Sequence, residues 1–263
     1  IKQNTLPYYF NESTVSSYPG VFEKANYNLV NGVNIHGEQF NYKIPFPWRN
    51  NKSSRNIRYK IQSWVMYDSL LRADYNAFLS SKKDNKYIIP IIELISEWID
   101  LYILEDNYCD EFSWYDMAVG QRATKLVYVM HRIIIDDNLF KQYFQFLSKF
   151  ILTSEIHMLE LMQKDKIAIH SNHGLFQMAG LLSLSKTFPI YRLSKDAKFF
   201  SISNIVKMLK QHFTSDGLHK EHSPEYHIYM ANYLSTLIES QYIQDSDILD
   251  LCRKVVENSK WLY

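Results

Sequence analysis

Apolar residues in this chain recur at intervals of three and four positions from about Ser54 to the end. One run follows Pro90, where Ile91, Leu94 and Trp98 would share one side of a helix. Pro90 suits the first turn of that helix, because the first turn has no use for the N–H that proline lacks. Glycine and proline number only 7 each among 263 residues, which argues against many short strands and tight turns. The chain is predicted to be mainly helical.

The spacing predicts eight helices joined by short connectors, with fewer than about 10% of residues in strands. The expected ranges are 54–80, a helix starting near 90, 116–135, 139–162, 174–185, 195–213, 224–242 and 246–262. Such helix hairpins stack as a bundle, a solenoid or a closed toroid, and periodicity leaves these three shapes open. Residues 1–50 contain four prolines and few periodic positions. We expect them to form an irregular segment packed on a helical domain over 51–263.

Composition excludes several classes of protein. The net charge is +1, so the basic footprint of a nucleic-acid-binding protein is absent. No apolar run approaches the roughly 18 residues that span a bilayer, so no membrane insertion is expected. Cys109 and Cys252 lie far apart and are interpreted as ordinary thiols. The chain starts at Ile1 and stops inside a predicted helix, which suggests a fragment of a longer protein.

Histidines cluster in two segments, since six of the nine lie between positions 170 and 227. In the first segment, Asn172-His173-Gly174 precedes an expected helix. Asn172 is a good N-cap residue, and capping alone would explain its position. The functional alternative is that the Asn172 amide and the His173 imidazole bind a carboxylate at the helix N-terminus.

The second segment leads into the helix expected over 224–242. Ser223 and Pro224 are typical of an N-cap and a first helical position, which places Tyr226 and His227 in the first turn. Asp216-Gly217 predicts a turn before it. A zinc site built from the histidines of this segment matches no known spacing, so no metal is predicted.

These two segments resemble the heparinase II/III group of polysaccharide lyases, within the N-terminal α/α-toroid domain of heparinase III-like members. The similarity rests on Asn172-His173-Gly174 and on Tyr226-His227, which begins 54 residues after Asn172 in the pattern Asp-Gly-x-His-x-Glu-x-Ser-Pro-x-Tyr-His. Trp114 with Arg122 is similar to the Trp-to-Arg helix segment of that family. The resemblance covers nearly the whole chain and favours the toroid, as an incomplete barrel of helix hairpins.

The resemblance implies β-elimination on a uronic-acid polysaccharide, the reaction of a carbon–oxygen lyase. It makes Asn172 and His173 the donors to the uronate carboxylate, and Tyr226 the residue that transfers protons. Donors on that carboxylate would stabilise the charge that develops when the neighbouring proton leaves. The residues expected to contact the acidic polysaccharide are Trp114, Arg122, Glu221, His222 and His227. We expect Asn172, His173 and Tyr226 to face one cleft.

Members of this family also have a C-terminal β-sandwich domain that contributes a further catalytic histidine, and nothing in this chain resembles it. We therefore expect the 263-residue chain to bind acidic oligosaccharide weakly and to show little elimination. The resemblance implies no cofactor in the toroid, although it allows a divalent cation in the C-terminal domain. It also implies a periplasmic or secreted bacterial protein. Heparan-type glycosaminoglycan, alginate and a bacterial capsular polymer all stay open as substrates.

Two other functions remain. An α/α-toroid glycoside hydrolase would use paired carboxylates, for which Asp216 with Glu221 or Glu225 are candidates. A carbohydrate-binding or assembly module of lyase ancestry would keep the aromatic platforms without turnover. The reaction products distinguish the three functions. A lyase forms an unsaturated uronate, a hydrolase forms only a new reducing end, and a binding module forms neither.

Overall fold

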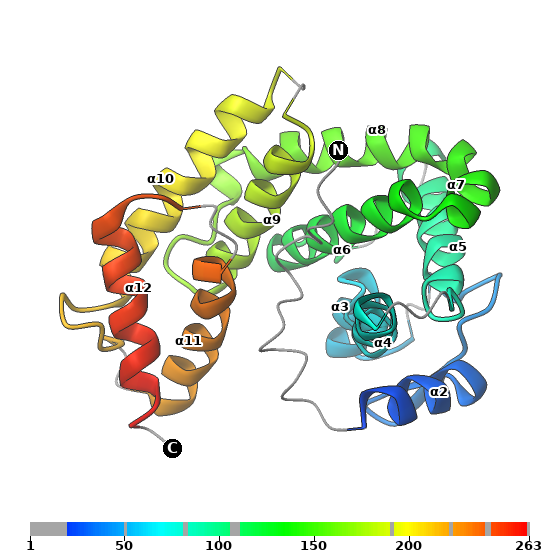
Figure 1. Ribbon diagram of the computed structural model, residues 1–263, viewed down its shortest axis with the longest axis horizontal. Helices are drawn as coiled ribbons and strands as arrows, with labels where there is room; N and C mark the ends of the chain where they lie inside the picture. The colour runs from blue at the N-terminus through cyan, green and yellow to red at the C-terminus, as the bar shows by residue number, and fades with distance from the viewer. Residues whose placement is uncertain are drawn as a thin grey trace.

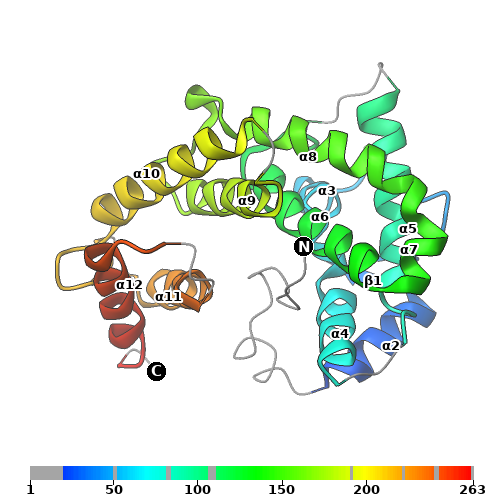
Figure 2. The same cartoon turned by 45° about the horizontal axis from the view of Figure 1, so that its top comes forward.

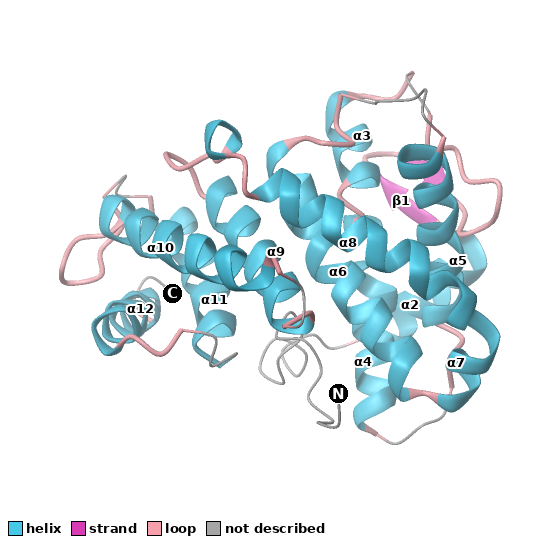
Figure 3. Ribbon diagram, turned by 90° about the horizontal axis from the view of Figure 1, so that it is seen from above, coloured by secondary structure: helices cyan, strands magenta, loops and turns pink. Residues whose placement is uncertain are grey.

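The computed structural model describes residues 20–49, 52–80, 84–105, 111–189, 192–220, 223–239 and 243–261. Helices dominate these residues, and the strands are the two three-residue segments β1 (Val33–Ile35) and β2 (Glu38–Phe40), which pair as an antiparallel hairpin. Figure 3 shows this small hairpin beside the helices. The prediction of an all-α fold is confirmed.

The helices run in chain order around the molecule. They are α2 (Val21–Asn31), α3 (Arg55–Gln62), α4 (Asp68–Leu79), α5 (Ile88–Ile99), α6 (Asp116–Ile135), α7 (Asp137–Tyr143), α8 (Leu147–Leu161), α9 (His173–Thr187), α10 (Ser194–His212), α11 (Pro224–Glu239) and α12 (Ser246–Ser259). Single turns of tighter or wider helix lie at Val65–Tyr67, Asp100–Leu104, Phe144–Phe146 and Lys164–Lys166. No helix in the described ranges is long and apolar enough to cross a membrane.

The helices follow a curved path, which is the incomplete toroid expected from the sequence. In Figure 2 the path runs from α2 and α4 through α5, α7 and α8 to α9 and α10, and then to α11 and α12 at the other end. Figure 1 shows α11 and α12 as an antiparallel hairpin at the C-terminal end of this path. The two ends of the curve thus come from opposite ends of the described chain.

Helix α6 is the shared wall between two hydrophobic cores. Tyr128 and Ile133 belong to the core built mainly from α3, α4 and α5, whereas Val119 and Val127 belong to the core built mainly from α9, α10, α11 and α12. A helix enclosed on both sides cannot keep a wide polar face. Its long cationic side chains are buried with it, and each therefore needs a polar partner inside the protein.

The helix expected over 54–80 is divided. Helix α3 ends at Gln62 and α4 starts at Asp68, with a sharp turn at Trp64, whose φ of 58° is left-handed. The Trp64 ring is fully buried and meets Trp98 edge-on at 5.3 Å between centroids. Packing of this ring offsets the free-energy cost of the left-handed backbone at Trp64. The helical spacing of apolar residues in the sequence does not indicate the contact with Trp98.

Two further expectations need correction. The helix expected over 139–162 is interrupted at Phe144–Phe146, between α7 and α8. Residues 20–50 are not uniformly irregular, because α2 occupies Val21–Asn31 and buries Val21, Ala25 and Asn28 at helical spacing. Gly32 follows α2 with a φ of 80°, which ends the helix where only glycine is comfortable. The part of residues 1–50 before Gly20 lies outside the described residues.

Candidate active site

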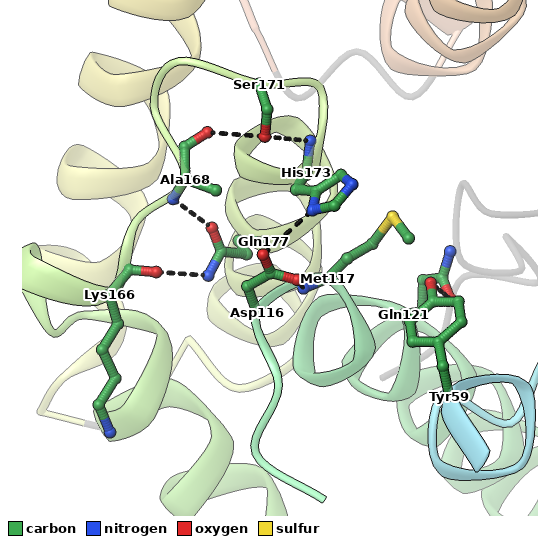
Figure 4. A network of polar contacts seen from close by, with 9 residues as sticks. All are labelled: Tyr59, Asp116, Met117, Gln121, Lys166, Ala168, Ser171, His173 and Gln177. Carbon is green, nitrogen blue, oxygen red and sulfur yellow. Dashed lines mark hydrogen bonds and ion pairs between the residues drawn. The ribbon is translucent and has the colours of Figure 1, made fainter. Parts of the chain in front are cut away.

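The loop before α9 is fastened by the side chain of Gln177. Its Oε1 accepts a hydrogen bond from the Ala168 backbone N–H at 2.9 Å, and its Nε2 donates to the Lys166 carbonyl at 2.9 Å. Figure 4 shows both bonds together with Ser171, whose hydroxyl accepts from the His173 backbone N–H at 3.2 Å. The loop that carries the Asn-His-Gly segment is therefore tied to α9 by side-chain hydrogen bonds, which favours an ordered loop.

Asn172 occupies the N-cap position of α9, but its side chain makes no capping hydrogen bond to the described backbone. Its φ and ψ of −58° and −19° are already helical, whereas a capping side chain requires an extended backbone at that position. The interpretation of Asn172 as a simple cap is wrong. The hydroxyl of the neighbouring Ser171 accepts a hydrogen bond from the His173 backbone N–H instead.

His173 is paired with Asp116, the first residue of α6. The His173 Nδ1 and Asp116 Oδ2 atoms lie 3.0 Å apart, and both side chains remain partly exposed. The second carboxylate oxygen of Asp116 accepts from the Met117 backbone N–H. Two helix N-termini, of α6 and α9, thus meet beside the imidazole. Such ends favour negative charge, as a bound carboxylate would supply.

Close contact between α6 and α9 fixes the distance between these two N-termini. A Cβ added to Gly120 would lie 2.3 Å from the Phe176 carbonyl oxygen, and one added to Gly180 would lie 2.5 Å from the Gly120 carbonyl oxygen. Only glycine lets the two backbones approach so closely. Gly120 lies one turn after Asp116, so the crossing is next to the His173–Asp116 pair.

Tyr226 projects from the first turn of α11 and is 49% exposed. Its backbone N–H donates to the Ser223 hydroxyl at 3.4 Å, which confirms that Ser223 caps this helix. One turn further on, the Tyr229 ring lies 5.8 Å from the Phe176 ring, and Tyr233 follows at 4.7 Å. These contacts pack α11 against the first turns of α9. That the Asn172 and Tyr226 side chains face one cleft stays a prediction.

Arg122 was expected to contact substrate, and the structure contradicts this. Its side chain is fully buried, donates to the Gln62 carbonyl at 2.6 Å and to the Ser113 carbonyl, and packs on Trp98 and Trp114. Burial lowers the pKa of the guanidinium to about 9. Arg122 therefore joins the segment before α6, at Ser113, to the end of α3, at Gln62. Its side chain does not reach the surface.

His157 lies against this buried cation. Arg122 Nε is 3.2 Å from His157 Nε2, and the His157 ring contacts the Trp114 ring at 5.3 Å between centroids. Burial and the charge of Arg122 lower the pKa of His157 to about 3. A neutral imidazole can accept the arginine hydrogen bond, which is the form that this position requires.

His227 is also buried, so its expected contact with substrate is wrong. Its Nε2 lies 2.9 Å from the Val255 carbonyl of α12, and its Nδ1 accepts from the His219 backbone N–H at 3.4 Å. It joins α11 to α12 and to the loop after α10. Gly217 in that loop has a φ of 80°, which confirms the turn predicted at Asp216-Gly217. Glu221 and His222 lie outside the described residues.

Trp114 is partly buried and lines a pocket of about 260 Å³. The other residues lining this pocket include Asp116, Glu160, Lys166 and Gln177. Two larger hollows lie elsewhere: about 340 Å³ between α2, β1 and the start of α4, and about 650 Å³ between the end of α10 and α12. Neither contains a predicted site residue, so the smaller pocket beside Asp116 is the better candidate. No group of three potential metal ligands occurs among the described residues.

The sequence gives no indication that Asp116 pairs with His173. An acidic residue at the start of a predicted helix is usually explained by the helix dipole, and this hides any distant partner. The hydrogen bond from the Tyr59 hydroxyl to Gln121 Oε1, 3.0 Å long and near the same end of α6, is a second contact that the sequence does not indicate. Burial raises the pKa of Tyr59, so this phenol stays protonated.

The curved path of the helices defines an α/α-toroid domain. Residues 14–248 match the family model described as the heparinase II/III N-terminus. The chain therefore belongs to the heparinase II/III family and is of polysaccharide-lyase lineage. No protein in a collection of curated sequences matches it significantly.

Solved structures with the same fold include a heparan sulfate lyase and a heparinase. The heparan sulfate lyase HepC from Pedobacter heparinus superposes with a TM-score of 0.68 at 17% identity, over 92% of this chain and 38% of that enzyme. A structure described as heparinase III gives a TM-score of 0.66 at 18% identity, over 98% of this chain and 41% of its own. The chain spans about two fifths of the length of these enzymes.

Proposed function

We propose that this chain is the toroid domain of a lyase that cleaves a uronic-acid polysaccharide by β-elimination. The observation that supports this proposal is the His173–Asp116 pair at the N-terminus of α9. The side chain of Asn172, next to His173, makes no capping hydrogen bond to the described backbone. Helix α11, which bears Tyr226, packs against the same helix through Phe176. These contacts support the proposal that hydrogen-bond donors to a carboxylate and a phenol act on one saccharide.

The proposed roles of Asn172, His173 and Tyr226 follow from the chemistry of β-elimination. The proton to be removed is on the carbon next to the uronate carboxylate, and it is barely acidic while the carboxylate keeps its full charge. Asn172 and His173 would donate to that carboxylate and stabilise the charge that develops on it. Tyr226 would take the proton as phenolate, or return one to the departing glycosidic oxygen. The electron pair of the C–H bond then forms the double bond as the glycosidic C–O bond breaks.

A second domain is part of this proposal. The related enzymes are longer than this chain, which spans about two fifths of them. We expect a C-terminal β-sandwich domain in the full-length protein to supply one more histidine and to close the site. Elimination depends on near-attack geometry and exclusion of water more steeply than binding does. The 263-residue chain should thus bind acidic oligosaccharide while turning it over poorly.

The test compares Tyr226→Phe with Tyr229→Phe in the full-length protein on glucuronate-containing polymers. The two tyrosines lie one turn apart on α11 and are similarly exposed, at 49% and 47%. Burial raises the pKa of Tyr229, which lowers the fraction of this residue present as phenolate. Tyr226→Phe should reduce formation of the ultraviolet-absorbing unsaturated uronate by about 10²-fold or more, whereas Tyr229→Phe should keep most of it.

Other outcomes would replace the proposal. A new reducing end without ultraviolet absorbance would indicate a glycoside hydrolase. Binding of the polymer by the full-length protein with no product at all would indicate a carbohydrate-binding module. Full elimination by the 263-residue chain, lost in Tyr226→Phe, would show that a second domain is not needed for the reaction.

The proposal includes a location. Large acidic polysaccharides are met outside the cytoplasm, so we propose that the protein is periplasmic or secreted in a bacterium. Fractionation of cells that express the full-length protein tests this, and recovery in the cytoplasmic fraction alone would contradict it.

A further inference from the structure

Within the described part of the chain, the His173 ring uses one of its two nitrogens, Nδ1, to contact a protein partner. Asp116 Oδ2 faces Nδ1 at 3.0 Å. Figure 4 shows Nε2 on the opposite side of the ring, pointing away from Asp116. An ionised carboxylate can only accept a hydrogen bond, so this contact favours a proton on Nδ1.

We infer that Asp116 is a positioning residue, which holds His173 as the Nδ1–H tautomer and presents Nε2 to the saccharide. The part of this inference that concerns the saccharide rests on the proposed lyase function. A neutral ring held this way offers a lone pair at Nε2. A ring that has gained a second proton offers an Nε2–H donor, which is the form that the proposed hydrogen bond to the uronate carboxylate needs, and Asp116 then balances its charge.

Both partners are held before any ligand binds. Asp116 is the first residue of α6 and has its other oxygen on the Met117 N–H. His173 is the first residue of α9, and its backbone is tied to Ser171. The backbone contact of α6 with α9 at Gly120 and Gly180 sets the spacing between the two helix starts. The ring is therefore oriented by the scaffold and not by the substrate.

Stability does not account for the pair. The His173 side chain is 33% exposed and that of Asp116 is 23% exposed. Ion pairs with this much access to water add little to folding stability. Removing the Asp116 carboxylate should therefore leave the melting temperature almost unchanged, while it frees the ring to change tautomer and direction. A catalytic effect without a stability effect separates positioning from a structural role.

The direct test is nitrogen NMR of the histidine rings in the 263-residue chain, at a pH where His173 is neutral. The His173 signals are assigned with His173→Gln. We expect the Nδ1–H tautomer in the wild type. In Asp116→Ala and in Asp116→Asn the proton should move to Nε2, because an alanine accepts nothing and an amide N–H can donate to Nδ1. Asp137→Asn is the matched control, since it removes the same charge from the first residue of α7.

The functional arm uses the full-length protein on a glucuronate polymer. Both Asp116 variants should lower kcat by about 10²-fold with a smaller change in KM, and shift the melting temperature by less than about 2 °C. A wild-type ring protonated at Nε2, or variants with unchanged kcat, would overturn the inference. A wild-type protein that keeps the Nδ1–H tautomer but shows no elimination would instead refute the proposed function and leave the pairing intact.

Discussion

The crossing of α6 and α9 makes Gly120→Ala the most informative stability variant. The new methyl carbon would lie 2.3 Å from the Phe176 carbonyl oxygen and 2.8 Å from the Gln177 Cα, and both are backbone atoms that cannot rotate away. Ordinary contact begins near 3.4 Å. The two helices must therefore separate by about 1 Å, in an interior that is packed without spare room.

Forced separation of this kind belongs at the upper end of overpacking costs, about 3 kcal/mol. For a chain of this size, each kcal/mol lowers the melting temperature by about 2–4 °C, so we expect a fall of about 6–12 °C. The same movement would lengthen the His173–Asp116 contact from 3.0 Å to beyond hydrogen-bonding distance. Thermal unfolding followed by circular dichroism measures the first effect.

Two further variants define the control. Gln121→Ala, at the next position of α6, removes only the bond with Tyr59 and should cost about 1 kcal/mol. Gly180→Ala should resemble Gly120→Ala, and the double variant should cost clearly less than the sum, because one separation accommodates both methyl groups. A Gly120→Ala protein that melts within about 2 °C of the wild type would refute the argument, and so would additive costs.

Two other predictions concern buried charge. Asp74→Ala should lower the free energy of unfolding in urea by about 3–5 kcal/mol, because buried Arg132, 2.7 Å from Asp74, loses its counter-charge; a loss below 1 kcal/mol would contradict this. His157, with a pKa of about 3, stays neutral in the folded protein, so the unfolded chain binds the extra proton below about pH 6.5. The free energy of unfolding should therefore fall by up to about 1.4 kcal/mol for each pH unit below about 6.5 because of His157. In His157→Gln, the free energy of unfolding should depend less steeply on pH.

Local signals in the sequence were sufficient for most helices. The predicted range 116–135 matches α6 at both ends, and the Ser223-Pro224 start of α11 is also correct. These features depend on residues within one or two turns of one another, so periodicity and capping preferences determine them. The family resemblance rested on motifs of the same local kind and identified the toroid, which periodicity alone left open among three shapes.

Contacts between distant residues decided what the sequence alone did not show. Trp64 divides a helix because its ring packs on Trp98. Arg122 matches the family motif, yet it lies in the core, since α6 is enclosed on both sides. His173 stands out in the sequence, but its partner Asp116 is 57 positions away and becomes visible only where α6 and α9 touch. Sequence spacing describes one helix at a time, whereas burial and pairing depend on which helices meet and on how closely their backbones approach.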